Sequence, residues 1–329
     1  MKLVVTVDTE ADNQWQHRPE ISLKNIVFLE RFQKVCEQYG FPPTYLITYE
    51  VATDEKAVSL LSSWQKRGVA EIGAHLHPWT TPPENGVAGP DGKIEHPFPS
   101  ELPYDLLENK LKSLSRAIHE SFGIKPVSYR AGRWGMDERQ LKILKDLGFK
   151  ADCSLTPKVD WRRNIGAKGG RGGKDWRSAS VYPYYPSECN IFLAENDKRL
   201  LEVPMTVLYT GVCCREKSAL CRIMSRLPES FPKKVLNRLF FKRKWLRVFP
   251  KSEIGHWRGI YDSAKLNNLP VMEFMIHSSE LMPGGSPSSK TESDVDAVYK
   301  NLEAMFTLFR DRGVQGVTLG QFADWFNSN

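Results

Sequence analysis

The sequence LVVTVDTE, residues 3–10, is an apolar run that ends in polar residues. Valine-rich runs of this length are typical of strands buried on both faces of a sheet. Similar runs lie at 44–48 and 69–77, and the stretches between them place apolar residues at three- and four-residue steps, as helices do. The chain therefore starts with strands that alternate with helices.

This alternation continues along most of the chain. We predict further strands at 126–131, 149–153 and 271–276, with helices at 24–39, 55–67, 102–122, 137–147 and 294–312. Strands alternating with helices favour a parallel sheet with crossover helices. Because 155–268 breaks the rhythm, we predict one α/β barrel domain over 1–329 that is interrupted there by an insertion, and not two independent domains.

Composition and charge limit the class of protein. The 329 residues are 41% hydrophobic and 26% charged, which is ordinary for a folded soluble protein and excludes collagen-like or wholly disordered chains. No stretch resembles a secretory signal or a membrane-spanning helix, and the six cysteines show no zinc-ribbon spacing. We expect a cytoplasmic protein with reduced thiols.

The net charge of +7 is concentrated in one segment. Residues 215–251 contain twelve basic and two acidic residues, so the rest of the chain is slightly acidic. Apolar residues within 233–248 suggest a basic amphipathic helix, which favours peripheral contact with a membrane surface or an anionic polymer. The alternative is the solvated face of a packed insertion. No recognised motif accompanies the charge, so we do not expect nucleic-acid binding.

Polar residues follow the predicted strands where the active sites of α/β barrels lie, at the carboxyl ends. Asp8 and Glu10 end the first strand on one face, and His75 and His77 share a face of the third. Two imidazoles and a carboxylate are typical ligands of a catalytic divalent metal, for which we expect zinc. We therefore predict Glu10, His75 and His77 as metal ligands.

Three further strand-end residues suggest catalytic roles. We predict Asp8 as general base and His277 as general acid, with Arg130 paired to Asp8 so that the pKa of that carboxyl stays low. Each has a plainer interpretation: an acidic helix cap, a histidine in a turn and a structural ion pair.

Four motifs resemble those of the NodB-homology polysaccharide deacetylases: VTVDTEAD (5–12), EIGAHLHPW (71–79), SYRAGRWG (128–135) and MIHSSELMPGG (275–285). The resemblance covers residues 1–154 and 269–329 and hardly touches 155–268. It implies a distorted (β/α) barrel of about seven strands that removes N-acetyl groups from a sugar polymer with a divalent metal.

The resemblance has gaps at the metal ligands. Thr9 stands where many members of the family have the metal-binding Asp. Some members carry this ligand one position later, which is Glu10 here, and Asp12 is the alternative. The family spaces its two histidines four residues apart, whereas His75 and His77 are two apart. His75 is the better match, and His77 rests on strand geometry.

The third and fourth motifs supply the remaining expected roles. Arg130 and His277 match the family's arginine and general acid, but Gly132 and Arg133 replace a Pro and an aromatic residue. Asp160 with Trp161, or Asp152, is expected to orient the histidine. The residues predicted to contact the substrate are Trp79, Arg133, Trp134 and Trp161, the tryptophans either stacking on sugar rings or packing at the rim.

The predicted function is metal-dependent removal of N-acetyl groups from a polysaccharide or sugar intermediate. Two alternatives stay open: hydrolysis of non-sugar C–N amide bonds, and carbohydrate binding without catalysis.

Overall fold

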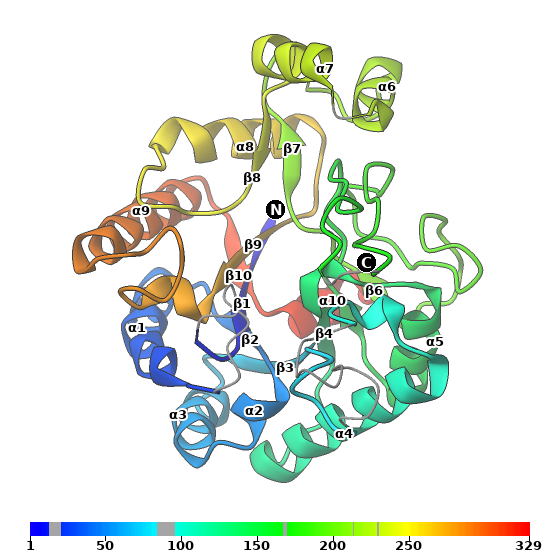
Figure 1. Cartoon of the computed structure of the whole chain (residues 1–329). Helices are drawn as coiled ribbons and strands as arrows, with labels where there is room; N and C mark the ends of the chain where they lie inside the picture. The colour runs from blue at the N-terminus through cyan, green and yellow to red at the C-terminus, as the bar shows by residue number, and fades with distance from the viewer. Residues whose placement is uncertain (13–20, 84–95, 167–169, 213, 229) are drawn as a thin grey trace.

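A parallel sheet forms the centre of the molecule in the computed structural model, which describes residues 1–12, 21–83, 96–166, 170–212, 214–228 and 230–329. The described residues give it eight strands, with β1 flanked on one side by β9 and on the other by β2 and β10 (Figure 1). From β2 the sheet continues through β3, β4, β5 and β6. The strands are β1 (Lys2–Thr9), β2 (Pro43–Ile47), β3 (Glu71–Leu76), β4 (Ser128–Ala131), β5 (Ala151–Asp152), β6 (Leu201–Glu202), β9 (Val271–His277) and β10 (Gln315–Val317).

The sheet curls into an incompletely closed barrel. Its two edges, β6 and β9, are joined by the segment after β6, where the Thr206 amide donates to the Glu273 carbonyl (3.4 Å) and the Glu273 amide donates to Thr206 Oγ1 (2.7 Å). The expected distorted (β/α) barrel is confirmed. The short strand β10, which pairs with the first residues of β1, takes the sheet beyond the expected seven strands.

Helices cover the outside of the sheet through apolar faces. In α1, Leu29, Phe32 and Cys36 are fully buried at three- and four-residue steps, and the helix ends at Gly40, whose φ of 72° suits a residue without a side chain. The other covering helices are α2 (Tyr49–Ala52), α3 (Glu55–Lys66), α4 (Tyr104–Phe122), α5 (Glu138–Leu147), α8 (Ile254–Leu266) and α9 (Glu292–Asp311), with a 3₁₀ turn η1 (Lys24–Phe28) before α1.

The barrel interior is apolar at one end and polar at the other. At the amino ends of the strands, Leu319 and Phe322 of α10 (Leu319–Ser328) pack against Val4 and Val271 in a small interior core. Further along, the inward positions become polar, beginning with Thr6. Among the described residues, the polar positions of the barrel interior therefore gather toward its carboxyl end.

The region predicted as an insertion, 155–268, contributes elements to the barrel itself. Residues 155–268 include strand β6 and helix α8, which packs against α9. The same region forms an antiparallel ribbon of β7 (Val207–Tyr209) and β8 (Arg243–Trp245), and between its strands lie α6 (Ala219–Arg226), α7 (Phe231–Leu236) and the π-helix η4 (Asn237–Phe241).

The helix predicted over 233–248 is wrong in its second half. The helical stretch ends at Phe241, and Lys242 adopts the left-handed conformation with φ of 53° before β8 begins. Strand pairing with β7 replaces the remaining helical turns. None of the helices in the described part of the chain has the length and apolar character needed to cross a bilayer.

Candidate active site

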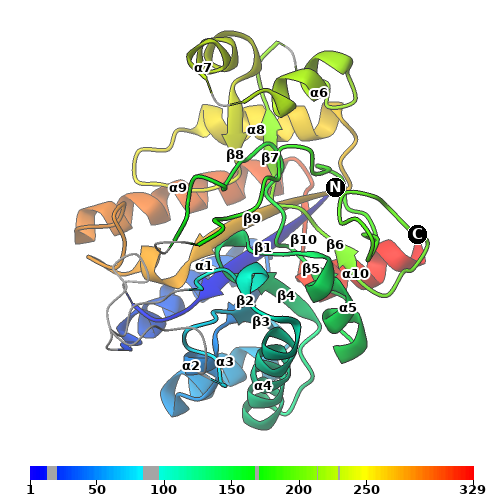
Figure 2. The same ribbon diagram turned by 45° about the vertical axis from the view of Figure 1, so that its right-hand side comes forward.

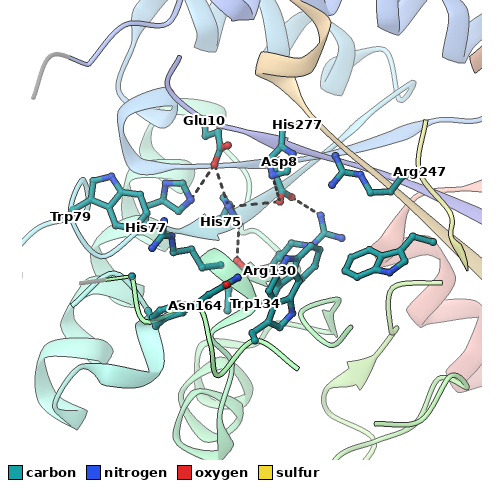
Figure 3. A pocket seen from close by; sticks show the side chains of 16 residues that line it. Asp8, Glu10, His75, His77, Trp79, Arg130, Trp134, Asn164, Arg247 and His277 are labelled. Atoms are coloured by element: carbon teal, nitrogen blue, oxygen red, sulfur yellow. Dashed lines mark hydrogen bonds and ion pairs between the residues drawn. The ribbon is translucent and has the colours of Figure 1, made fainter. Parts of the chain in front are cut away.

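A cavity of about 380 Å³ opens at the carboxyl ends of the strands (Figure 3). Its walls come from β1, β3, β4 and β9, from the short η3 turn (Gly132–Trp134), and from the 155–268 region. The cavity brings together the residues predicted as catalytic groups, first-choice metal ligands and substrate contacts: Asp8, Glu10, His75, His77, Trp79, Arg130, Arg133, Trp134, Trp161 and His277.

One buried carboxylate faces two imidazoles. Glu10 Oε2 lies 3.1 Å from His77 Nε2 and 3.6 Å from His75 Nε2, and all three side chains are buried. On its other nitrogen, His75 Nδ1 donates to the Arg130 carbonyl (3.0 Å), which leaves the Nε2 lone pair directed toward Glu10.

This donor set fits a divalent metal. A carboxylate oxygen and an imidazole lone pair that face each other in a buried site repel unless a cation or a proton lies between them. Burial lowers the pKa of His75, but the nearby Asp8 and Glu10 carboxylates outweigh it and raise that pKa overall. Burial raises the pKa of the Glu10 carboxyl, but the closeness of the His75 and His77 rings lowers it overall. Burial lowers the pKa of His77, which keeps that ring neutral and able to bind a cation. The site therefore favours positive charge at its centre.

Asp12, the alternative ligand, serves a different purpose. Its carboxylate accepts hydrogen bonds from the amides of Lys24 (3.0 Å) and Asn25 (2.9 Å) and from the Ser22 hydroxyl (2.8 Å). These contacts tie the chain after β1 to the start of η1. The geometry therefore favours Glu10 over Asp12 as the carboxylate of the metal site.

The Asp8 carboxylate is paired with a fully buried arginine. Arg130 Nη1 lies 2.5 Å from Asp8 Oδ1, and its Nη2 donates to Glu273 Oε1 (2.6 Å) and to Thr6 Oγ1 (2.9 Å). Its Nε donates to the Cys153 carbonyl (3.1 Å), so the guanidinium is held from several sides. Burial raises the pKa of Asp8, but Arg130 and the neighbouring histidines bring it below its ordinary value.

The second oxygen of Asp8 faces two histidines. Asp8 Oδ2 lies 3.9 Å from both His75 Nε2 and His277 Nε2. His277 Nδ1 contacts Glu280 Oε2 (3.2 Å), which also accepts from the His277 amide (3.0 Å) and from Arg247 Nη2 (2.5 Å). Burial raises the pKa of Glu280, but Arg247 and His277 lower it to about 2.

The residue that orients His277 is therefore Glu280, which the sequence analysis missed. The expected candidates are engaged elsewhere: Asp160 pairs with Arg162 and Arg177, and Asp152 accepts from the Ser154 hydroxyl. The spacing could have indicated this role, because Glu280 follows His277 by three residues on the turn η5 (Ser278–Leu281), as the acidic residue of a capping box does.

Two residues that depart from the family motifs, His77 and Gly132, lie next to each other in the structure. A Cβ atom at Gly132 would lie 2.4 Å from the Leu76 carbonyl oxygen and 2.8 Å from Cδ2 of His77. The Leu76 carbonyl, together with the imidazole at position 77, therefore leaves room only for glycine at position 132. The two residues that follow, Arg133 and Trp134, both adopt left-handed backbone conformations, with φ of 53° and 59°.

Aromatic side chains form the rim of the cavity. Trp79 stacks on the His77 ring, with centroids 4.3 Å apart and planes at 25°, and the Arg133 guanidinium lies 6.0 Å from the Trp79 ring. Trp161 packs edge-on against Trp245, with centroids 6.0 Å apart.

Trp245 and Arg247 were not predicted as site residues. They come from the basic segment 215–251, which was expected to act away from the chemistry. Phe98 and Asn164 also line the cavity without having been predicted. The basic segment therefore shapes the site as well as the surface.

No protein-family model matches the sequence, and no curated protein matches it significantly. Solved structures do match, over nearly the whole chain. A protein from Mycobacterium smegmatis named as a polysaccharide deacetylase gives a TM-score of 0.55 at 15% identity, covering 99% of this chain and 90% of that one. A protein from Parabacteroides distasonis named as a glycoside hydrolase/deacetylase gives 0.60 at 13% identity, covering 99% and 71%.

A third solved structure, PuuE allantoinase, gives a TM-score of 0.53 at 11% identity and covers 100% of this chain and 90% of that one. At these identities the likeness is one of fold. This chain has the barrel fold of proteins named as deacetylases, in agreement with the resemblance of its four motifs.

Proposed function

We propose that the protein is a metal-dependent hydrolase that removes N-acetyl groups from a polysaccharide or a sugar intermediate. One observation carries the proposal: the Glu10, His75 and His77 set lies beside a carboxylate, Asp8, and an oriented imidazole, His277. Ligands for a Lewis acid, a base and an acid thus converge on one cavity.

Glu10, His75 and His77 would hold the metal ion, and we expect zinc. When bound, such an ion polarises an acyl carbonyl and lowers the pKa of water toward neutrality. The hydrogen bond from His75 Nδ1 to the Arg130 carbonyl would fix the ring in the orientation that metal binding requires.

Asp8 is the general base of the proposed reaction. Arg130 occupies Oδ1 and keeps the carboxylate ionised, while Oδ2 is directed toward the histidines of the cavity. Asp8 Oδ2 would accept the proton of the attacking water.

His277 is the general acid. Its Nδ1 faces Glu280, so Nε2 points into the cavity on the side of Asp8. With Nδ1 held by the Glu280 carboxylate, the imidazole would donate the Nε2 proton to the departing amine.

The walls of the cavity support a carbohydrate substrate. Trp79, Trp134, Trp161 and Trp245 all line it, and indole faces provide flat apolar surfaces with a polar edge, which suit sugar rings. Arg133 and Asn164 add polar groups to the lining.

Hydrolysis of a non-sugar C–N bond is the second candidate. The match to an allantoinase structure shows that this barrel also occurs in an enzyme of that name. The Glu10–His75–His77 set with Asp8 and His277 would serve either substrate, because these residues act on the amide and not on the ring beside it.

A release assay distinguishes the two candidates. Purified protein loaded with zinc is tested for acetate release from N-acetylated oligosaccharides and for hydrolysis of small amides and ureides. We expect acetate release that is lost in Asp8→Asn. Activity on the small amides alone would favour the second candidate, and inactivity on both panels by a metal-loaded protein would contradict the proposal.

A further inference from the structure

The helical part of the basic segment exposes large apolar side chains. In α6, Leu220 and Ile223 are 53% and 58% exposed, and in α7 and η4 Phe231 and Leu239 are 78% and 59% exposed. We call residues 215–242 the basic platform. Its other exposed apolar residues in the helices and the turn after α6 are Leu227, Val235, Leu236 and Phe240.

These side chains are not the platform's own core. Cys221 and Met224 of α6 are buried against Tyr209 and Phe241, and this small core attaches the helix to the β7–β8 ribbon. Leu220 and Ile223, which alternate with the two buried residues, are turned away from it. The platform therefore has an inner apolar side that packs and an outer apolar side that does not.

Basic residues run beside the exposed apolar rows. Phe231, Val235 and Leu239 follow one another at four-residue steps, and Lys234 and Arg238 form a parallel row at the same spacing. All five are exposed. In α6, Arg222 and Arg226 are likewise exposed beside the row of Leu220, Ile223 and Leu227.

The platform lies at the periphery of the molecule. In both ribbon views α6 and α7 extend beyond α8 and the β7–β8 ribbon, on the side away from the barrel (Figures 1 and 2). Nothing in the described part of the chain covers their outer side. A flat surface could approach these helices without meeting the barrel first.

We infer that the basic platform docks on the surface of a membrane that contains anionic lipids. Helices that lie in a membrane interface combine exposed apolar residues with lysines and arginines, which are attracted to anionic headgroups. The exposed Arg215, Lys217, Arg222, Arg226, Lys234, Arg238 and Lys242 supply that charge, whereas the acidic residue described within the platform, Glu216, is bound to Lys158.

The charge argues against the other occupants of such a surface. A second copy of the chain would bring two strongly basic faces together, which is unfavourable. Nucleic acid would match the charge but offers no place for the aliphatic side chains of Leu220, Ile223 and Leu239. An anionic bilayer satisfies both features at once.

Co-sedimentation of the full chain with vesicles tests this inference. We expect binding to vesicles of phosphatidylcholine with phosphatidylglycerol and little binding to phosphatidylcholine alone. The Ile223→Asp/Leu239→Asp variant, and separately the Lys234→Glu/Arg238→Glu variant, should weaken binding by about tenfold or more. Hydrogen exchange of the unmodified protein should show protection of 219–241 on binding, which does not depend on any variant's folding.

Matched controls lie elsewhere on the surface. Leu193 is 59% exposed, as Leu239 is, and Leu193→Asp should leave vesicle binding unchanged. Lys34→Glu/Lys56→Glu reverses two exposed charges on α1 and α3 and should also leave vesicle binding unchanged. Three outcomes would overturn the inference: no binding to anionic vesicles, binding that the platform variants retain, or a dimer that only the platform variants dissociate.

Discussion

Glu280 accepts two hydrogen bonds from His277, one from the backbone amide (3.0 Å) and one from the ring nitrogen Nδ1 (3.2 Å). A single carboxylate oxygen thus fixes both the position and the orientation of the imidazole. Arg247 contacts the same oxygen, so a residue of the 155–268 region determines the charge behind the proposed general acid.

Glu280→Gln should lower the free energy of unfolding at neutral pH and make it less dependent on pH in the acid range. The pKa of Glu280 falls from 4.5 to about 2 on folding, so the carboxylate stabilises the native state above pH 4.5 and this contribution is lost as the pH falls toward 2. The difference between native protein and variant should be on the order of 3 kcal/mol at pH 7 and shrink toward pH 2.

Urea unfolding at a series of pH values measures this difference. Glu303→Gln removes an exposed carboxylate on α9 and should not change the pH profile. A constant difference between Glu280→Gln and the native protein from pH 7 to pH 2 would refute the assignment.

His75→Ala should abolish metal binding. The substitution removes one of the three donors and the tautomer fixed by Arg130. Metal content after zinc loading and desalting, measured by mass spectrometry, should be near stoichiometric in the native protein and close to background in the variant. Asp12→Asn is the control and should retain the metal, because Asp12 binds the backbone before α1. If Asp12→Asn folds normally but loses the metal, the carboxylate ligand is Asp12 and not Glu10.

Gly132→Ala should disturb the metal site through His77. The added methyl would meet the Leu76 carbonyl at 2.4 Å and the His77 ring at 2.8 Å, so the ring or the backbone must shift. We expect a loss of about 1–3 kcal/mol in stability and weaker zinc binding. Gly255→Ala on α8 provides the comparison, because its added methyl would contact nothing within 4 Å and should be neutral or slightly stabilising. If Gly132→Ala and Gly255→Ala have the same stability and the same zinc affinity, the close contact between position 132 and His77 is contradicted.

Trp245→Ala should raise the KM for an oligosaccharide and change kcat little. Trp245 lines the cavity and packs against Trp161, whereas the ion pairs of Asp8 and Glu10 in the described part of the chain are made with arginine and histidine side chains. Steady-state kinetics on the substrate identified by the acetate assay test this expectation. Trp325→Ala, on α10 at the amino end of the barrel, should leave both constants unchanged. A large loss of kcat with constant KM would assign Trp245 to the chemistry instead.

The parts of the fold that the sequence predicts are those determined locally. Runs such as 3–8 and 271–276 carry their own signal, since each is apolar, short and bounded by polar residues. Strand β6 has no such signal: it is two residues long and is defined by its pairing with β5 and by a bridge from Glu202 to Tyr184. Its place in the sheet depends on how 155–200 folds, and no local pattern predicts that path.

The same distinction applies to the site. Asp8, His75 and His277 were found because each ends a recognisable strand. Trp245 and Arg247 follow a left-handed turn at Lys242 that interrupts an apparently helical pattern, so their direction depends on the pairing of β8 with β7. Residues brought to a cavity by tertiary contacts leave little trace in the chain near them.

The position of β1 in the sheet affects how the protein can be synthesised. Lys2–Asp8 pairs with Val271–His277 on one side, so the strand that carries the proposed base emerges from the ribosome long before that neighbour. Until then the nascent chain presents a valine-rich edge with open backbone hydrogen-bonding groups. Cotranslational folding must therefore stop at an unfinished sheet, and we expect chaperones that shield such edges to matter for the yield of this protein.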